Sequence, residues 1–163
     1  MANTQAMCTS FMQQLMVGEH QLGTATLVSR TSLTAPTTDT LKAALYLTTA
    51  TVNAATTAYS ASNEVSGTNY VAGGVTVTNA TAPNSTNTTA TAGVAFFTPS
   101  ASITYTTVTL ATAFDAVLIY NSTQSNKAIS VHTFGSQTIT AGTFTLTMPA
   151  NGASTALIRL ATT

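Results

Sequence analysis

The sequence FDAVLIYNSTQSNKAISVHTF, residues 114–134, predicts a β-hairpin around which the other strands of the fold pack. Its first part, Ala116 to Tyr120, is continuously apolar, which is typical of a strand buried on both faces. Its last part, Ile129 to Thr133, alternates between apolar and polar side chains, as in a strand with one buried face. Between them, Asn121 to Lys127 is rich in Asn, Ser, Thr and Gln, residues that satisfy turn backbone locally. We therefore expect this hairpin at the centre of the molecule.

Further short strands are predicted by other apolar or alternating runs. They cover residues 41–48, 75–78, 94–97, 103–110, 143–148 and 156–161, with weaker strand character at 25–28. A slip in the alternation at Thr106-Thr107 indicates a β-bulge. Gly135 and Gly142 are expected to bracket a turn, and residues 49–63 and 79–93 are expected to be loops. The side chains expected in the core are Leu45, Leu47, Val117, Ile119, Phe144 and Leu146.

One helix is predicted, from Thr4 to Glu19. Cys8, Phe11, Met12 and Leu15 follow one another at the spacing of a single helical face. Two interpretations remain open: the helix covers one edge of the β core, or it docks on a neighbouring subunit. Methionines suit either role, because their flexible side chains adapt to irregular surfaces. The candidate partner-contact residues on this segment are Met7, Phe11, Met12 and Leu15.

These elements predict a mainly β fold, an antiparallel β-sandwich that is jelly-roll-like and carries one N-terminal helix. The chain of 163 residues has the length of a single domain, residues 1–163. Residues 1–22 form its N-terminal helix or arm, and residues 23–163 form the sandwich. No alternation of strands with helices occurs, so a parallel α/β fold is not expected.

Charged residues are sparse, with four basic and four acidic side chains and a net charge of zero. Nucleic-acid binding needs clustered Lys and Arg, so no nucleic-acid partner is expected. No apolar run approaches the about 18 residues that span a bilayer, and no secretory signal is recognisable, so no membrane partner is expected. A surface of uncharged polar residues, rich in Thr and Ala, suits a chain that packs into an assembly and associates with itself.

Catalytic and metal-binding patterns are missing from the sequence. His20 and His132 are the two histidines, and neither lies in a metal-binding motif. Cys8 lies on the apolar helical stripe, which favours a buried small side chain over a nucleophile. Glu64 lies in the Gly-rich segment EVSGTNYVAGG, where a structural carboxylate is favoured over a catalytic acid; it would either accept hydrogen bonds from loop amides or pair with one of the four cations. We therefore expect no enzyme activity, no catalytic residues, no metal and no cofactor.

A set of short motifs carries a family resemblance. They are Gly18-Glu19-His20, Leu41 to Tyr46, Thr57-Ala58-Tyr59, Glu64 to Gly67, Tyr70 with Gly73-Gly74, and Leu118 to Asn121. With these motifs the chain resembles a family of small virion structural proteins of tailed bacteriophages. Two departures are visible: residues 21–39 are long for the family, and Asn69 stands where Gly is common.

The resemblance implies a capsid cement or decoration protein. Such a protein would bind the major capsid protein on the outer surface of the virion, form a homo-oligomer, often a trimer, and be made in the cytoplasm of the host bacterium. Two alternatives stay open: a tail, baseplate or fibre adhesion component, and a free carbohydrate-binding module. The carbohydrate-binding module is disfavoured by the absence of Trp for stacking on sugars, although five tyrosines remain.

Overall fold

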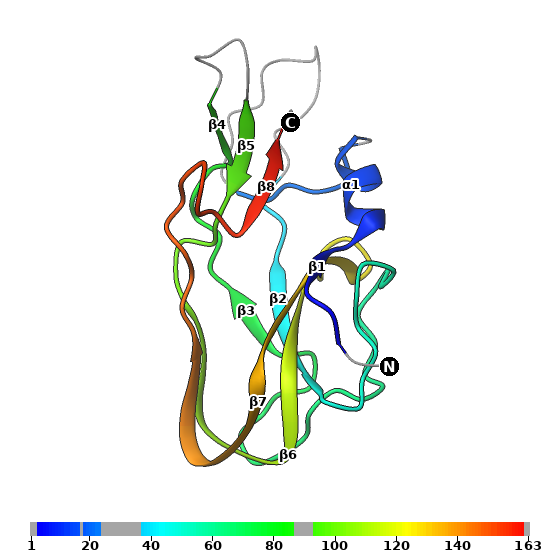
Figure 1. Cartoon of the computed structure of the whole chain (residues 1–163), viewed down its shortest axis with the longest axis vertical. Helices are drawn as coiled ribbons and strands as arrows, with labels where there is room; N and C mark the ends of the chain where they lie inside the picture. The colour runs from blue at the N-terminus through cyan, green and yellow to red at the C-terminus, as the bar shows by residue number, and fades with distance from the viewer. Residues whose placement is uncertain (1–2, 17, 24–36, 87–92, 162–163) are drawn as a thin grey trace.

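The computed structural model describes residues 3–16, 18–23, 37–86 and 93–161. Within them, two antiparallel sheets and one short helix confirm the predicted mainly β sandwich with an N-terminal helix (Figure 1). The five-stranded sheet has the order β1-β7-β6-β2-β3 and consists of β1 (Ala6–Met7), β7 (Lys127–Leu146), β6 (Ile103–Asn121), β2 (Leu41–Leu47) and β3 (Val75–Val77). The three-stranded sheet has the order β4-β5-β8 and consists of β4 (Asn84–Thr86), β5 (Val94–Phe97) and β8 (Ile158–Ala161).

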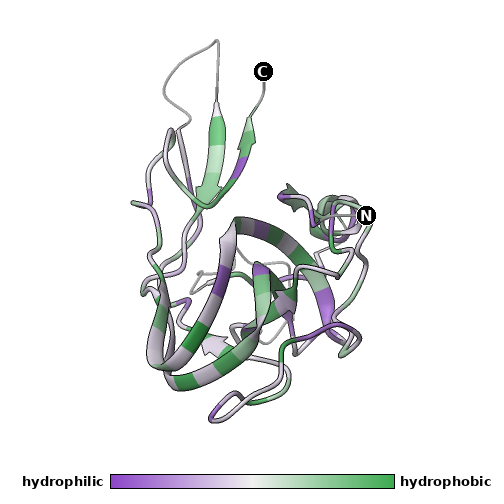
Figure 2. Cartoon of the chain, turned by 60° about the horizontal axis from the view of Figure 1, so that its bottom comes forward, coloured by the Kyte–Doolittle hydropathy of each residue, from purple (hydrophilic) through white to green (hydrophobic). Residues whose placement is uncertain are grey.

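The predicted central hairpin is confirmed and is longer than expected. Strands β6 and β7 pair from Asn121↔Lys127 at the turn to Ile103↔Leu146 at the far end. Figure 2 shows apolar and polar bands alternating along both long strands. The turn predicted between Gly135 and Gly142 is wrong, because β7 runs through this segment. Irregular register there, with Leu110 opposite Ile139 and Val108 opposite Gly142, bends the ribbon without ending the pairing.

The predicted irregularity at Thr106-Thr107 is confirmed by a register shift between Tyr105 and Val108. Thr107 has a positive φ of 53°, which a β-branched residue rarely adopts. The side-chain amide of Asn69 donates to the Thr107 carbonyl oxygen at 2.9 Å and supports this backbone. Asn69 itself has a φ of 60°, a conformation that Asn tolerates better than most residues.

The predicted helix starts too early. Ala6 and Met7 form β1, which pairs with Val131 and Ser130 of β7, and α1 covers only Thr9–Met16. The reason lies in tertiary contacts that local propensity does not include. The side chain of Asn3 donates to the carbonyl oxygen of Leu47 at 3.1 Å, and its oxygen accepts from the amide of Val52 at 3.0 Å. These bonds hold the first residues extended along the sheet.

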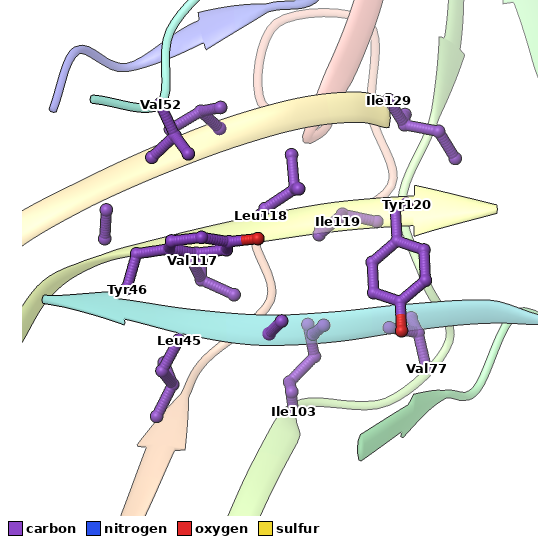
Figure 3. Close-up of a cluster of buried hydrophobic side chains, with 14 of the residues drawn as sticks. Leu45, Tyr46, Val52, Val77, Ile103, Val117, Leu118, Ile119, Tyr120 and Ile129 are labelled. Carbon is purple, nitrogen blue, oxygen red and sulfur yellow. The ribbon is translucent and has the colours of Figure 1, made fainter. Parts of the chain in front are cut away.

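The core is centred on side chains of β6 and of its sheet neighbours β2 and β7. Figure 3 shows Leu45, Val117, Leu118 and Ile119 among its buried side chains. Six residues were predicted to be buried. Three of them are buried: Leu45, Val117 and Ile119. The other three are only half-buried, so the prediction overstates their burial: Leu47, Phe144 and Leu146. The far half of β7 is covered on one side only, where Phe144 meets Phe114 with ring centroids 5.2 Å apart.

The remaining predicted elements have mixed outcomes. The strands at 41–48, 75–78 and 94–97 are confirmed within a residue, and the last strand begins at Ile158. Residues 49–63 contain turns and an isolated bridge but no strand or helix, as expected. The loop predicted at 79–93 is wrong at Asn84–Thr86, because these residues pair with β5 to form β4. The weak strand predicted at 25–28 lies outside the described residues.

Candidate functional site

The four candidate partner-contact residues lie on β1 and α1, beside the three-stranded sheet (Figure 1). Phe11 is 0% exposed and packs edge-on against the His20 ring at 4.9 Å, so it belongs to the core and offers no surface to a partner. Met12 is 42% exposed, while Met7 and Leu15 are half-buried. Met16, at the end of α1, is 88% exposed. The helix therefore covers the core with one face and presents methionines on the other.

An apolar groove of about 220 Å³ separates α1 from the three-stranded sheet. Leu15 of α1 forms one wall, and Phe96 of β5 with Ile158 and Leu160 of β8 forms the other. Leu160 is 39% exposed at its rim. Sequence reasoning predicted the helical wall but missed the sheet wall. Alternation along residues 156–161 puts Ile158 and Leu160 on one face of the strand, but it does not indicate that this face lies toward α1.

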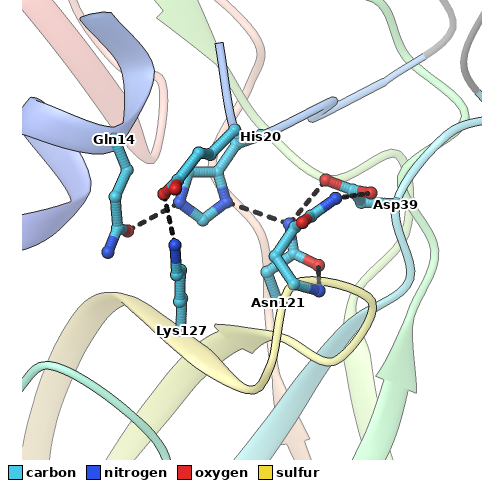
Figure 4. Close-up of polar contacts among 7 residues, drawn as sticks. Gln14, His20, Asp39, Asn121 and Lys127 are labelled. Atoms are coloured by element: carbon cyan, nitrogen blue, oxygen red, sulfur yellow. Dashed lines mark hydrogen bonds and ion pairs between the residues drawn. The ribbon is translucent and has the colours of Figure 1, made fainter. Parts of the chain in front are cut away.

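A polar network fixes the segment after α1 to the hairpin turn (Figure 4). His20 Nε2 lies 2.8 Å from Gln14 Oε1, and His20 Nδ1 lies 2.9 Å from Asn121 Nδ2. The amide nitrogen of Asn121 also donates to Asp39 Oδ2 at 2.6 Å. Because Asn121 Nδ2 can only donate, His20 Nδ1 must accept, and the proton is then on Nε2. The network thus requires a neutral His20, and burial lowers the pKa of this imidazole from its ordinary value.

The same turn carries an ion pair between Lys127 and Glu19, with Nζ and Oε2 2.5 Å apart. Asn121 is fully satisfied, since its side-chain oxygen accepts from the amides of Thr123 and Gln124. Each polar side chain in this network is fixed by a hydrogen bond or ion pair to a neighbouring residue. The arrangement positions α1 over the sheet and leaves no polar atom of Asn121 free for chemistry.

A second polar cluster surrounds Glu64 and contains tyrosines from separate segments of the chain. Glu64 Oε1 accepts from the Tyr70 hydroxyl and from the Gly73 amide, both at 2.7 Å, and Oε2 accepts from the Tyr59 hydroxyl at 2.6 Å. The Tyr120 hydroxyl donates to the Gly73 carbonyl oxygen at 2.7 Å. The prediction that Glu64 accepts a hydrogen bond from a loop amide is confirmed.

The tyrosines of this cluster also pack on one another. The rings of Tyr59 and Tyr120 stack at 4.7 Å, and those of Tyr70 and Tyr105 stack at 6.0 Å. Burial and the bond to the Glu64 carboxylate raise the pKa of Tyr70 above its ordinary value. The Tyr70 hydroxyl is therefore a protonated donor at neutral pH. The cluster ties the 59–73 segment to β2 and β6.

Burial shapes the environment of the Cys8 thiol and the His132 imidazole. Cys8 is 0% exposed, as predicted, and burial raises the pKa of its thiol to about 11, which suppresses the reactive thiolate. His132 Nε2 lies 2.9 Å from Ser130 Oγ, and burial lowers the pKa of the imidazole to about 4. Neither residue contacts a carboxylate that would complete a catalytic relay in the contacts described.

The pKa shifts of the two histidines predict acid sensitivity. Both imidazoles are uncharged in the folded chain, and the unfolded chain takes up protons near pH 6.5. Their contribution to stability is therefore complete above about pH 6.5 and is lost as the pH falls toward the folded-state values. At about pH 5 we expect His132 alone to lower the free energy of unfolding by about 2 kcal/mol relative to about pH 7.5, with a further decrease from His20.

Urea unfolding followed by circular dichroism at the two pH values measures this difference. The double variant His20→Gln with His132→Gln is the control, because glutamine keeps a donor and an acceptor without titrating. We expect its stability to change much less between the two pH values. Equal stability of the natural chain at both would contradict the prediction.

Among the described residues, no group of three or more His, Cys, Asp or Glu side chains has an arrangement that could hold a metal ion. Of the helices described, none has the length and hydropathy needed to cross a membrane. Comparison of the chain with protein-family models, curated proteins and solved structures finds no match.

Proposed function

We propose that this chain is a structural protein of a tailed-bacteriophage particle, and that it acts as a cement protein on the outer surface of the capsid. In this role it binds the major capsid protein and itself, and it stabilises the shell without catalysing a reaction. The observation that carries a binding role is the apolar groove between α1 and β8, with the exposed side chain of Leu160 at its rim. The virion setting comes from the sequence resemblance.

The use of charge in the fold supports an assembly role. All four acidic side chains make internal contacts: Glu19 with Lys127, Asp39 with Asn121, Glu64 with two tyrosines, and Asp115 with Asn3. Few charges therefore remain to repel neighbouring subunits. Contacts between uncharged surfaces depend little on salt, which suits a lattice contact. Each interface would contribute on the order of 8–12 kcal/mol, in the range of micromolar to nanomolar affinity.

The alternatives receive less support. A carbohydrate-binding module would need exposed aromatic faces, whereas Tyr46, Tyr105 and Tyr120 are buried and Tyr59 and Tyr70 stack against other tyrosines. A tail or baseplate protein could use the same fold and the same groove, so only the position in the particle separates that function from the cement function.

Heating particles that lack the protein tests the proposal. Shells assembled without it are expected to be complete but to release their DNA at a lower temperature than natural particles, because the lattice loses one set of contacts. Adding back the purified chain should restore the release temperature. DNA release is followed with an intercalating dye during a temperature ramp.

The control is the chain added to particles that already carry it, where no further stabilisation is expected. Particles that keep their thermal stability without the protein but no longer attach to cells would overturn the cement function and support a tail protein. Copy number gives a second readout, since hundreds of copies indicate the shell and about a dozen indicate the tail.

A further inference from the structure

A second hollow lies on the opposite side of β8 from the apolar groove. This cleft has a volume of about 310 Å³, and its walls come from β1, from β7 near Ser130 and His132, and from residues 156–159. Ile158 lines both the cleft and the groove. In the described sheets, β1 is the edge strand of one and β8 is the edge strand of the other. Figure 1 shows β8 and β1 on the same side of the molecule. The cleft is thus a gap between two sheet edges.

On both sides of the gap, main-chain groups of an edge strand point away from the strand that pairs with it. The amide of Cys8 donates to the Ile129 carbonyl oxygen at 2.9 Å, and Ala6 is opposite Val131. Because alternate residues of a strand direct their main-chain groups to opposite sides, Met7 directs its N–H and C=O away from β7. In β8, one edge pairs with β5, and no described strand pairs with the other. An extended chain in the gap would therefore find hydrogen-bonding partners on the exposed edges.

The side chains around β8 carry charge of one sign only, which is positive. Arg159 is the one charged side chain among those that line the cleft and the groove, apart from the two histidines, which are neutral at pH 7. It is exposed, and no acidic side chain of the described residues lies within ion-pair distance of it. An acidic side chain brought by a partner would meet an unopposed guanidinium, whereas a basic one would be repelled.

We propose that the cleft between β1 and β8 accepts an extended segment of a partner protein, which pairs with the open strand edge, places an acidic residue against Arg159 and packs apolar side chains into the neighbouring groove. Alternating side chains of one extended segment point to opposite faces, which matches a polar cleft and an apolar groove on the two sides of β8. The inference deepens the proposed function by naming its contact surface, and it rests on that function only for the identity of the partner.

Binding of labelled synthetic peptides to the full chain tests the proposal. The probe is a peptide of about nine residues that alternates valine with threonine and carries a central glutamate. One control replaces the glutamate with lysine, and another methylates alternate backbone nitrogens to remove main-chain donors. By fluorescence anisotropy we expect a Kd of about 10–100 µM for the glutamate peptide and binding at least about tenfold weaker for both controls.

A charge reversal in the protein gives the sharpest comparison. Arg159→Glu is expected to reverse the preference, so that the lysine peptide binds better than the glutamate peptide. Arg159→Gln should bind the two alike. Both variants should keep the unfolding midpoint of the natural chain, because the Arg159 side chain is exposed and makes no ion pair with a described residue. Failure of all peptides to bind, or equal binding of the glutamate and lysine peptides to the natural chain, would overturn the proposal.

Light scattering identifies the occupant of the cleft. The particle-heating experiment then tests the cleft and the cement function separately. If the natural chain is an oligomer that Arg159→Glu dissociates in light scattering, the occupant is a second copy and the proposed partner segment is wrong. If Arg159→Glu restores heated particles as well as the natural chain does, the cleft inference fails while the cement function stands. If the peptides show the charge reversal but the natural chain does not protect particles, the cleft stands and the cement function fails.

Discussion

Replacing Glu64 by alanine is expected to lower the free energy of unfolding by about 3–5 kcal/mol. The carboxylate accepts hydrogen bonds from Tyr59, Tyr70 and the amide of Gly73, at 2.6, 2.7 and 2.7 Å. Its removal leaves these donors without an acceptor, and the buried ones lose more than the net value of a hydrogen bond because they cannot return to water. The loop that ends at Gly73 would then separate from β2 and β6.

Glutamine at the same position is the matched control. Its Oε1 can still accept from Tyr70 and Gly73, and only the bond from Tyr59 loses its acceptor. We expect Glu64→Gln to cost about 1–2 kcal/mol, since a neutral acceptor makes a weaker bond than a carboxylate. Tyr59→Phe, which removes one donor, should cost about 1 kcal/mol.

Urea unfolding monitored by circular dichroism measures all three variants. The decisive quantity is the difference between alanine and glutamine at position 64. If the two substitutions destabilise equally, the charge alone matters and the hydrogen-bonded cluster does not. If neither changes the unfolding midpoint, the cluster contributes nothing to stability and its structural role is wrong.

The hairpin could be predicted because its signals are local. The apolar run of Ala116 to Tyr120, the polar turn and the alternation after Ile129 each appear within a few residues, and the structure pairs them as expected. The segment between Gly135 and Gly142 could not be predicted in the same way. Glycines there indicate a turn, but pairing with β6 at Ile139 and Gly142 carries the strand through. Tertiary pairing overrides local preference at that point.

The helix start was mispredicted for a related reason. The apolar spacing of Cys8 and Phe11 fits a helix from Thr4, and it says nothing of the bonds that Asn3 makes to residues more than forty positions away. Those bonds favour an extended start that pairs with β7. The same stripe correctly indicated that Cys8 is buried, whereas Phe11, which was predicted as a partner contact, lies in the core as well.

The polar clusters and the β8 surface depend on residues that are distant in sequence. His20 reaches Asn121, and Leu15 and Leu160 come to line the same groove, only after the chain has folded. A single sequence contains no signal that pairs them. Taken alone, the sequence shows mainly which patterns are missing. Charged residues are few, the two histidines are far apart, and a glutamate lies in a Gly-rich segment without a second acidic or basic group close to it in sequence. To predict the groove and the cleft, one would have to know which strands are the edge strands of each sheet.

Replacing Gly74 by alanine is expected to cost more than about 4 kcal/mol, well above the same change at Gly18 or Gly135, and to prevent normal folding. Gly74 has a φ of +73°, and a Cβ there would lie 1.6 Å from the Ala43 carbonyl oxygen and 2.8 Å from Ala44 Cα. Both atoms belong to the backbone of β2, so no side-chain rotation relieves the clash. The pairing of Ala43 with Val75 would have to open, and with it the join between β2 and β3.

Two other glycines separate the steric effect from backbone strain. Gly18 has a similar φ of +76° but nothing within 4 Å of a Cβ, so Gly18→Ala should cost about 1 kcal/mol from the left-handed conformation alone. Gly135 has open space and no positive φ, so Gly135→Ala should change stability by less than about 0.5 kcal/mol. Thermal unfolding and the yield of folded protein rank the three variants. A Gly74→Ala chain that unfolds at the same temperature as Gly18→Ala would mean that β2 and residue 74 do not approach as closely as described, because strain would then be the whole cost.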